Sequence, residues 1–249
     1  MFTGIVTAIG TITTVEDKGD LRVTVACPWD PAGIDIGASI ACSGVCLTVV
    51  EKGGEEGDAW FAVDVSGETV SRTAQDQWHA DRRLNLEPAL RLGDELGGHL
   101  VTGHVDAVGR VVLAEDIGGS TRLEILAGAD IAPFVAEKGS ITIDGVSLTV
   151  NEVDDEPGGE VRFALNIIPH TGEVTTLGDL SEGDTVNLEI DVLARYLGQR
   201  LNAEPDVDIL HAQHLHSGPA AVEVGRAHGR ATVVTVRDYW PVCLHGTSW

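Results

Sequence analysis

Two short segments place a thiol or hydroxyl side chain two residues before a threonine. Residues 44–48 read Gly-Val-Cys-Leu-Thr, and residues 145–149 read Gly-Val-Ser-Leu-Thr. Side chains alternate between the faces of a strand, so Cys46 and Thr48 share one face and Leu47 takes the other. A small nucleophile beside a hydroxyl, after a glycine that lets a ligand approach the backbone, predicts the lip of a ligand site. A core strand with polar residues at its edge is the alternative.

The two segments belong to an internal repeat. Four blocks of sequence recur in the same order at an almost constant offset of 99 to 102 residues. The matched blocks are 1–10 with 100–109, 39–49 with 140–150, 61–69 with 163–171, and 85–87 with 187–189. This regularity predicts two copies of a domain of roughly a hundred residues, which meet near Gly97 and Gly98.

Polar differences between the copies are the most informative positions, because identical copies would carry two equal sites. The second copy has His104, Asp144, Ser147 and Asp191 where the first has Ile5, Ser43, Cys46 and Ala89. Both copies keep the threonine, as Thr48 and Thr149. A histidine titrates near neutral pH, so His104 is a candidate proton carrier, with a structural histidine as the alternative.

Short strands separated by turns make up each copy. Alternating β-branched residues predict strands at 21–26, 45–50, 59–65 and 161–167, and glycines predict hairpin turns at 52–54 and 156–159. About six strands per copy, with no long helix between them, predict an all-β protein of antiparallel barrels. One helix is predicted at 192–201, where Leu193, Tyr196, Leu197 and Leu201 fall on one face. That face must dock on its own barrel or bundle with copies of itself.

The chain of 249 residues is strongly acidic, with 39 Asp and Glu against 16 Lys and Arg and a formal charge of −23. This charge repels phosphate backbones and anionic lipid, so we expect neither nucleic-acid nor membrane binding. Only three of the basic residues are lysines, which suggests adaptation to a salty interior, although a GC-rich genome that favours arginine codons would give the same bias. The sequence shows no targeting segment and no long apolar run, so a cytoplasmic protein is expected. The four cysteines lack the spacing of a metal site or a disulfide framework.

At these residues the chain resembles the riboflavin synthase family, in its alpha-chain type with two lumazine-binding repeats. The similarity extends over about residues 1–201 and rests on 1–6, 44–48, 97–105, 138–149, 168–171 and 187–191. The resemblance implies two tandem six-stranded antiparallel Greek-key β-barrels, followed by a short helix that assembles a homotrimer. It also implies a transferase that dismutates two 6,7-dimethyl-8-ribityllumazine molecules to riboflavin and 5-amino-6-(D-ribitylamino)uracil, without metal or cofactor.

The resemblance further implies roles for the matching positions. The catalytic candidates are His104, Cys46, Ser147, Thr149 and Asp191. His104 would carry the proton of the acidic C7 methyl group, and Asp191 would orient or stabilise the adduct. The substrate-binding candidates are Gly4, Ile5, Val6, Cys46, Leu47, Thr48, Asp64, Val65, Ser66, Gly67, Glu68, Thr69, Gly103, His104, Val105, Lys138, Ser147, Leu148, Thr149, Ile168, Pro169, His170, Thr171, Gly172 and Glu173.

Two stretches depart from the family pattern. Residues 71–83 lack the Thr-x-Leu-Gly turn of the second copy, whose last three residues are Thr-Leu-Gly at 176–178. Residues 205–249 carry five of the nine histidines, and a poorly ordered extension is expected there, with a metal site at His211, His214 and His216 as the alternative. We therefore expect barrels at 1–98 and 99–191, an oligomerisation helix at 192–204 and an atypical tail at 205–249.

Two other functions need weighing against the enzyme. A non-catalytic lumazine- or flavin-binding protein of the same fold needs the ring pockets but not the proton carrier, so the presence of all five catalytic candidates favours catalysis. The flavin-binding barrel of a reductase is a third possibility. It is disfavoured because no Gly-x-Gly-x-x-Gly dinucleotide segment follows a strand.

Overall fold

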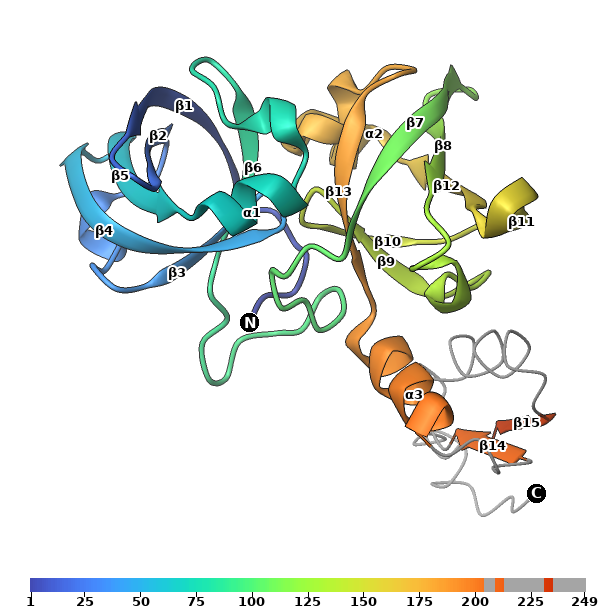
Figure 1. Cartoon of the computed structure of the whole chain (residues 1–249). Helices are drawn as coiled ribbons and strands as arrows, with labels where there is room; N and C mark the ends of the chain where they lie inside the picture. Colours follow the sequence, from blue (N-terminus) through green and yellow to red (C-terminus); the bar gives the residue numbers. More distant parts are fainter. Residues whose placement is uncertain (204–208, 213–230, 235–249) are drawn as a thin grey trace, which may run out of the picture.

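Two β bodies lie side by side, with α3 projecting below them (Figure 1). The computed structural model describes residues 1–203, 209–212 and 231–234. The first body is a closed antiparallel barrel in which the strands follow the order β1-β2-β5-β4-β3-β6. Its strands are β1 (Ala8–Asp17), β2 (Leu21–Cys27), β3 (Ser39–Cys42), β4 (Val45–Glu55), β5 (Asp58–Val65) and β6 (Arg83–Pro88). Short helices η1 (Pro31–Gly33), α1 (Gly67–Arg72) and η2 (Gln75–Gln77) connect them.

The second body repeats this arrangement as a curled sheet of order β10-β9-β13-β7-β8-β12-β11. Its strands are β7 (Ala107–Asp116), β8 (Thr121–Ala127), β9 (Ser140–Ile143), β10 (Val146–Thr149), β11 (Glu152–Asp155), β12 (Val161–Ile167) and β13 (Thr185–Ile190). Its short helices are η3 (Ala132–Phe134), η4 (Pro157–Gly159), α2 (Pro169–Val174) and η5 (Thr176–Asp179). The long β4 of the first barrel is split here into β10 and β11, at the position where β4 itself has a register shift between Val49 and Glu51. The prediction of an all-β protein with two antiparallel barrels is confirmed.

One predicted turn is wrong and one is confirmed. Residues 52–54 lie inside β4, and the chain reverses only after Glu55. The glycine serves packing there, because a Cβ on Gly53 would lie 2.6 Å from the indole ring of Trp60 on the neighbouring strand. In the second copy η4 does join β11 to β12, as the glycines at 156–159 predict.

Each barrel has its own apolar core, and the atypical stretch 71–83 completes the first one. Trp78 is buried in the first core, and its indole N–H donates to the hydroxyl of Thr73 at 2.9 Å. In the second copy Leu177, from the turn that 71–83 lacks, is buried in the equivalent core. The first copy therefore fills its core from a different position, and the register recovers at β6.

The barrels meet at two equivalent hairpin turns. Ser43 and Asp144 both have φ of +45°, and the glycines that follow them both have φ of +80°. A Cβ on Gly44 would lie 2.9 Å from the backbone nitrogen of Gly145, and a Cβ on Gly145 would lie 2.7 Å from that of Gly44. Only glycine fits both the left-handed conformation and this contact.

Asn85 and Asn187 reinforce the contact between the barrels in reciprocal fashion. The amide nitrogen of Asn85 donates to the carbonyl of Asp144, and that of Asn187 donates to the carbonyl of Ser43, both at 2.9 Å. Each asparagine oxygen accepts from a backbone N–H of the opposite copy, at Thr176 and Ala74 respectively. The repeated Asn-Leu-Glu blocks thus hold the two barrels in a symmetric orientation.

The helix α3 (Val192–Ala203) follows the second barrel directly. Asp191 caps it, since its carboxylate accepts from the N–H of Leu193 at 2.8 Å. Leu193 and Tyr196 are 40% and 63% exposed, so this side of the predicted apolar face does not dock on its own barrel. Beyond it, β14 (Ile209–Ala212) and β15 (Ala231–Val234) form a parallel pair. Most of the tail, for which the sequence predicts a poorly ordered extension with a metal site at 211–216 as the alternative, lies outside the described residues. Among the described helices none is long and apolar enough to cross a bilayer.

Candidate functional site

Two segments that precede the barrels cross to the opposite barrel. The carbonyl of Gly103, ahead of the second barrel, accepts from the N–H of Cys46 on the first at 2.8 Å. The carbonyl of Gly4, ahead of the first barrel, accepts from the N–H of Ser147 on the second, also at 2.8 Å. Accordingly Val105 packs against the first core and Val6 against the second. Segment 102–105 therefore belongs to the face of Cys46, and segment 3–6 belongs to the face of Ser147.

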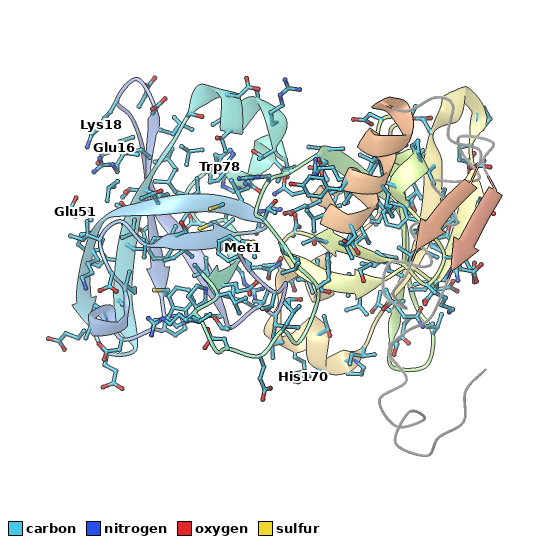
Figure 2. The ribbon with its side chains drawn as sticks, turned by 90° about the horizontal axis from the view of Figure 1, so that it is seen from below. Met1, Glu16, Lys18, Glu51, Trp78 and His170 are labelled. Atoms are coloured by element: carbon cyan, nitrogen blue, oxygen red, sulfur yellow. The ribbon has the colours of Figure 1, made fainter. Side chains whose placement is uncertain are left out.

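The crossing segments also pair with each other. The N–H of Phe2 donates to the carbonyl of Val101 at 2.7 Å, and the N–H of Val101 donates back at 3.1 Å. Met1 accordingly lies where the two barrels meet (Figure 2). The polar differences between the copies have to be regrouped on this basis, because His104 follows Gly103, which bonds to the first barrel, and Ile5 follows Gly4, which bonds to the second.

The face of the first barrel is built around β3 and β4. Cys46 is half-buried and Thr48 is exposed, whereas Leu47 points into the core, as the predicted alternation requires. Phe2, Ala41 and Val101 form a small buried apolar cluster next to Cys46 and Ala89. His104 is exposed and directly follows Gly103, whose carbonyl bonds to Cys46. The first barrel thus offers an apolar surface with one thiol and one exposed imidazole.

The second barrel carries polar groups at the matched positions, where Thr142, Ser147 and Asp191 replace Ala41, Cys46 and Ala89. His99 joins them: its Nδ1 lies 2.7 Å from the hydroxyl oxygen of Ser147, and its Nε2 lies 3.2 Å from that of Thr142. Burial lowers the pKa of His99, and the charge of Asp191 opposes this shift only in part. A neutral imidazole therefore lies in hydrogen-bond contact with a hydroxyl, which is the arrangement of an activated nucleophile or a proton relay.

His99 is the residue that comparison of the repeats did not reveal. The first matched blocks of the repeat are 1–10 and 100–109, so His99 lies just outside them. A histidine just ahead of the repeat, in the glycine-rich link, is the only signal that the sequence contains.

Two other positions that the sequence singled out, Gly44 and Asp144, lie in the contact between the two barrels. Gly44 makes its close approach to Gly145 of the other barrel, so the contact between the barrels accounts for this glycine without a ligand. Asp144 lies buried in the barrel contact, where its carboxylate accepts from the N–H of Asn187 at 2.8 Å and burial raises its pKa to about 7. The difference between Ser43 and Asp144 therefore belongs to the barrel interface and lies away from both faces.

The remaining candidates occupy strand ends and short helices. Asp64 is the last residue but one of β5 and forms an ion pair with Arg22, and the hydrogen bond between them lowers the pKa of Asp64. Ser66 caps α1, accepting from the N–H of Thr69 at 3.2 Å. In the equivalent place, residues 168–173 supply the N-cap and the first five residues of α2, and His170 is exposed there (Figure 2). Thr149 is exposed and follows Ser147 on β10, so both threonines of the repeated segments face outward.

Lys138 has an unusual backbone. Its φ is +64°, in the left-handed region, whereas the matched residue of the first copy is Gly37 with φ of +85°. A side chain in this conformation costs on the order of 1 kcal/mol, which glycine avoids. The exposed Lys138 next to β9 therefore adopts a conformation of higher free energy, which the glycine of the first copy avoids.

Comparison with known proteins gives the same division of the chain. A family model described as lumazine binding domain matches twice, over residues 3–89 and 102–191. The riboflavin synthase of Brucella abortus is 47% identical over 202 residues, which cover 79% of this chain and 96% of the relative. The chain belongs to the riboflavin synthase family. The riboflavin synthase of Mycobacterium tuberculosis strain H37Rv is 44% identical over 200 residues, with the same coverage of both chains.

A solved structure shares the fold of this riboflavin synthase family member at lower identity. The crystal structure of LumP complexed with riboflavin has a TM-score of 0.64 at 24% identity, and covers 76% of this chain and 99% of its own. Within the described residues no group of three histidine, cysteine or acidic side chains is arranged to hold a metal ion.

Proposed function

We propose that the protein dismutates two molecules of 6,7-dimethyl-8-ribityllumazine to riboflavin and 5-amino-6-(D-ribitylamino)uracil, by transfer of a four-carbon unit. The observation that carries this proposal is the pair of equivalent faces with different chemistry, one around Cys46 and one around Ser147. Two identical substrates must play different parts in a dismutation, so two duplicated half-sites have to differ. Family membership of the chain supports the same reaction.

In this proposal each barrel face binds one lumazine. Cys46 and Thr48, with the crossing segment 103–105, form one half-site, and Ser147 and Thr149, with segment 4–6, form the other. Backbone groups of the crossing segments read the ring edges, and residues 64–69 and 168–173 line the ring and ribityl sites. The strained backbone of Lys138 supports a polar contact of its ammonium group with substrate.

The catalytic roles follow from the groups on each face. His104 carries the proton of the acidic C7 methyl group. Ser147 and Thr149 take part on the second face, where the neutral imidazole of His99 accepts the hydroxyl proton of Ser147. Asp191 caps α3, and its negative charge acts on the imidazole of His99. We therefore assign Asp191 a positioning and stabilising role. Holding two rings in register contributes the largest rate effect, since effective molarities reach roughly 10⁵ M or more.

The half-sites complete one another between chains. His104 is exposed in the single chain, and so are Leu193 and Tyr196 on α3. We therefore propose a homotrimer in which α3 helices bundle and the first face of one chain meets the second face of a neighbour. A cytoplasmic location suits this biosynthetic activity. If the charge of −23 reflects salt adaptation, molar salt will strengthen the trimer by screening repulsion.

Binding without turnover is the alternative function, and one assay separates the two. Purified protein is incubated with the lumazine, and riboflavin is followed by its fluorescence, with one riboflavin expected for every two lumazines consumed. His104→Ala and Cys46→Ser are each expected to lower kcat more than they weaken binding. Stoichiometric lumazine binding by the wild-type protein with no riboflavin formed would establish the non-catalytic alternative.

A further inference from the structure

Two buried glutamates, each the last residue but one of its strand, on β6 and β13, hold the crossing segments. The carboxylate of Glu189 accepts through Oε1 from the N–H and the hydroxyl of Thr102, both at 2.7 Å. Its Oε2 accepts from the N–H of Gly103 at 2.9 Å and from that of His104 at 3.1 Å. Four donors thus surround one carboxylate that is only 2% exposed.

Glu87 makes the same arrangement with the other segment. Its Oε1 accepts from the N–H of Thr3 at 2.7 Å and from the hydroxyl of Thr3 at 2.8 Å. Its Oε2 accepts from the N–H of Gly4 at 2.9 Å. Among the described residues neither carboxylate forms an ion pair, so their partners are the donors of the crossing segments. Burial raises the pKa of both carboxyls.

Each glutamate lies on one barrel and holds a segment that lies on the other. Glu189 lies on the second barrel, but the segment that it holds lies on the first, where the Gly103 carbonyl accepts from Cys46. Glu87 lies on the first barrel, but its segment lies on the second, where the Gly4 carbonyl accepts from Ser147. Each carboxylate therefore acts on the face of the opposite barrel.

We propose that Glu87 and Glu189 are positioning residues with crossed effects: Glu189 fixes the half-site around Cys46 and His104, and Glu87 fixes the half-site around Ser147. The assignment of these faces as half-sites rests on the proposed function, whereas the crossed control of their backbone does not. Each half-site is thereby held by a residue of the barrel that carries the other half-site. This suits a dismutase, which needs two unequal rings held in register.

A carboxylate is required because every partner is a donor. A glutamine at position 189 would place its NH₂ group against either the Thr102 pair or the Gly103 and His104 pair, so two donors would face a third. Hydrogen bonds to a charged group are stronger than neutral ones, and a buried donor left without an acceptor carries the full desolvation penalty. Glutamine has nearly the same size and shape as glutamate, so Glu189→Gln should loosen segment 102–105 only by weakening its hydrogen bonds.

Alkylation of cysteine thiols by iodoacetamide, quantified for each peptide by mass spectrometry, tests the proposal without reference to activity. Cys46 reports on the first face, because segment 102–105 covers it. Cys42 and Cys27 are buried and report on global unfolding of the same barrel. In the variant Ser147→Cys the new thiol reports on the second face. Glu189→Gln and Glu87→Gln are each made with and without that reporter.

Glu189→Gln is expected to raise the alkylation rate of Cys46 by about tenfold or more, with Cys42 and the reporter at position 147 unchanged. Glu87→Gln is expected to do the reverse, raising only the rate at position 147. Thr102→Val and Thr3→Val remove one hydroxyl donor each, keep the carboxylate, and should give the same crossed pattern with smaller increases. These two variants also carry the test if a glutamine variant fails to fold.

Two results would overturn the proposal. One is a rise at Cys46 and Cys42 together in Glu189→Gln, since that reports global destabilisation. The other is an uncrossed pattern, in which each glutamate affects the face of its own barrel. Failure of the proposed function looks different: the wild-type protein would form no riboflavin from the lumazine, while the alkylation pattern of the variants would stand.

Discussion

The Nδ1 atom of His99 lies 2.7 Å from the hydroxyl oxygen of Ser147, although one residue belongs to the link between the barrels and the other to β10. The matched position of the first barrel has Cys46 beside the aliphatic side chains of Ala41 and Val101. The duplicated faces therefore differ by a complete hydrogen-bonded group, and the difference is larger than any single substitution between the repeats.

The pH dependence of turnover should report His99. Burial lowers the pKa of its imidazole, so at neutral pH the ring is uncharged and Nδ1 can accept from Ser147. As the pH falls through this lowered pKa, protonation removes the acceptor and kcat should fall. His99→Gln is expected to lower kcat by about 100-fold, to change binding little, and to abolish this acid limb.

His79→Gln is a suitable control for this experiment, because His79 is exposed and lies away from both faces. It should keep the wild-type profile. An acid limb that persists unchanged in His99→Gln would exclude His99 as the titrating group.

The repeat predicted most of the fold, because strand periodicity and matched blocks are local signals. It did not predict partners across the barrel contact. Ile5 and His104 are equivalent in the alignment of the copies, yet the segment that carries each one bonds to the opposite barrel, through Gly4 and Gly103 respectively, and strand periodicity does not reveal this. A glycine in the sequence can mark either a turn or a close packing contact, and the sequence alone does not distinguish the two. Gly53 accommodates the ring of Trp60 and marks no turn.

Asp144 should make stability depend on pH in the direction opposite to most acidic residues. Burial raises its pKa from 3.8 to about 7 in the folded protein, so folding stabilises the protonated form. Its contribution to the free energy of unfolding is complete below the pKa of the unfolded chain and is lost as the pH rises to about 7. Asp144→Ser introduces the residue of the first copy, whose hydroxyl accepts the equivalent N–H of Asn85.

Denaturant unfolding at about pH 4 and about pH 8 measures this effect as the difference between wild type and Asp144→Ser. The variant should be more stable by a few kcal/mol at the higher pH, and this advantage should vanish at the lower pH. The other acidic residues titrate in both proteins and cancel. A difference that does not vary with pH would show that Asp144 keeps its charge when buried.

Lys138 should lower the stability of the fold and strengthen the binding of the lumazine. Replacing it by glycine, the residue of the first copy, relieves a left-handed backbone and should raise the free energy of unfolding by about 1 kcal/mol. The same variant should bind the lumazine more weakly, because it removes the ammonium group beside the second face. Thermal unfolding and lumazine titration measure the two effects. Gly37→Lys is the reciprocal control and should destabilise the fold without improving binding, and unchanged affinity in Lys138→Gly would remove the residue from the site.

The exposed side of α3 should decide both assembly and turnover. Leu193→Asp places a charge on the apolar stripe and leaves the backbone N–H of residue 193 free to donate to Asp191, so the helix still begins normally. The variant is expected to sediment as a monomer and to lose most of its riboflavin-forming activity, while each chain still binds riboflavin. A chain that ends at Asp191 should behave in the same way, whereas one that ends at Ala203 should stay assembled and active. Because each proposed half-site pair spans two chains, assembly and turnover must be lost together, and a monomeric Leu193→Asp variant with full kcat would place both half-sites within one chain.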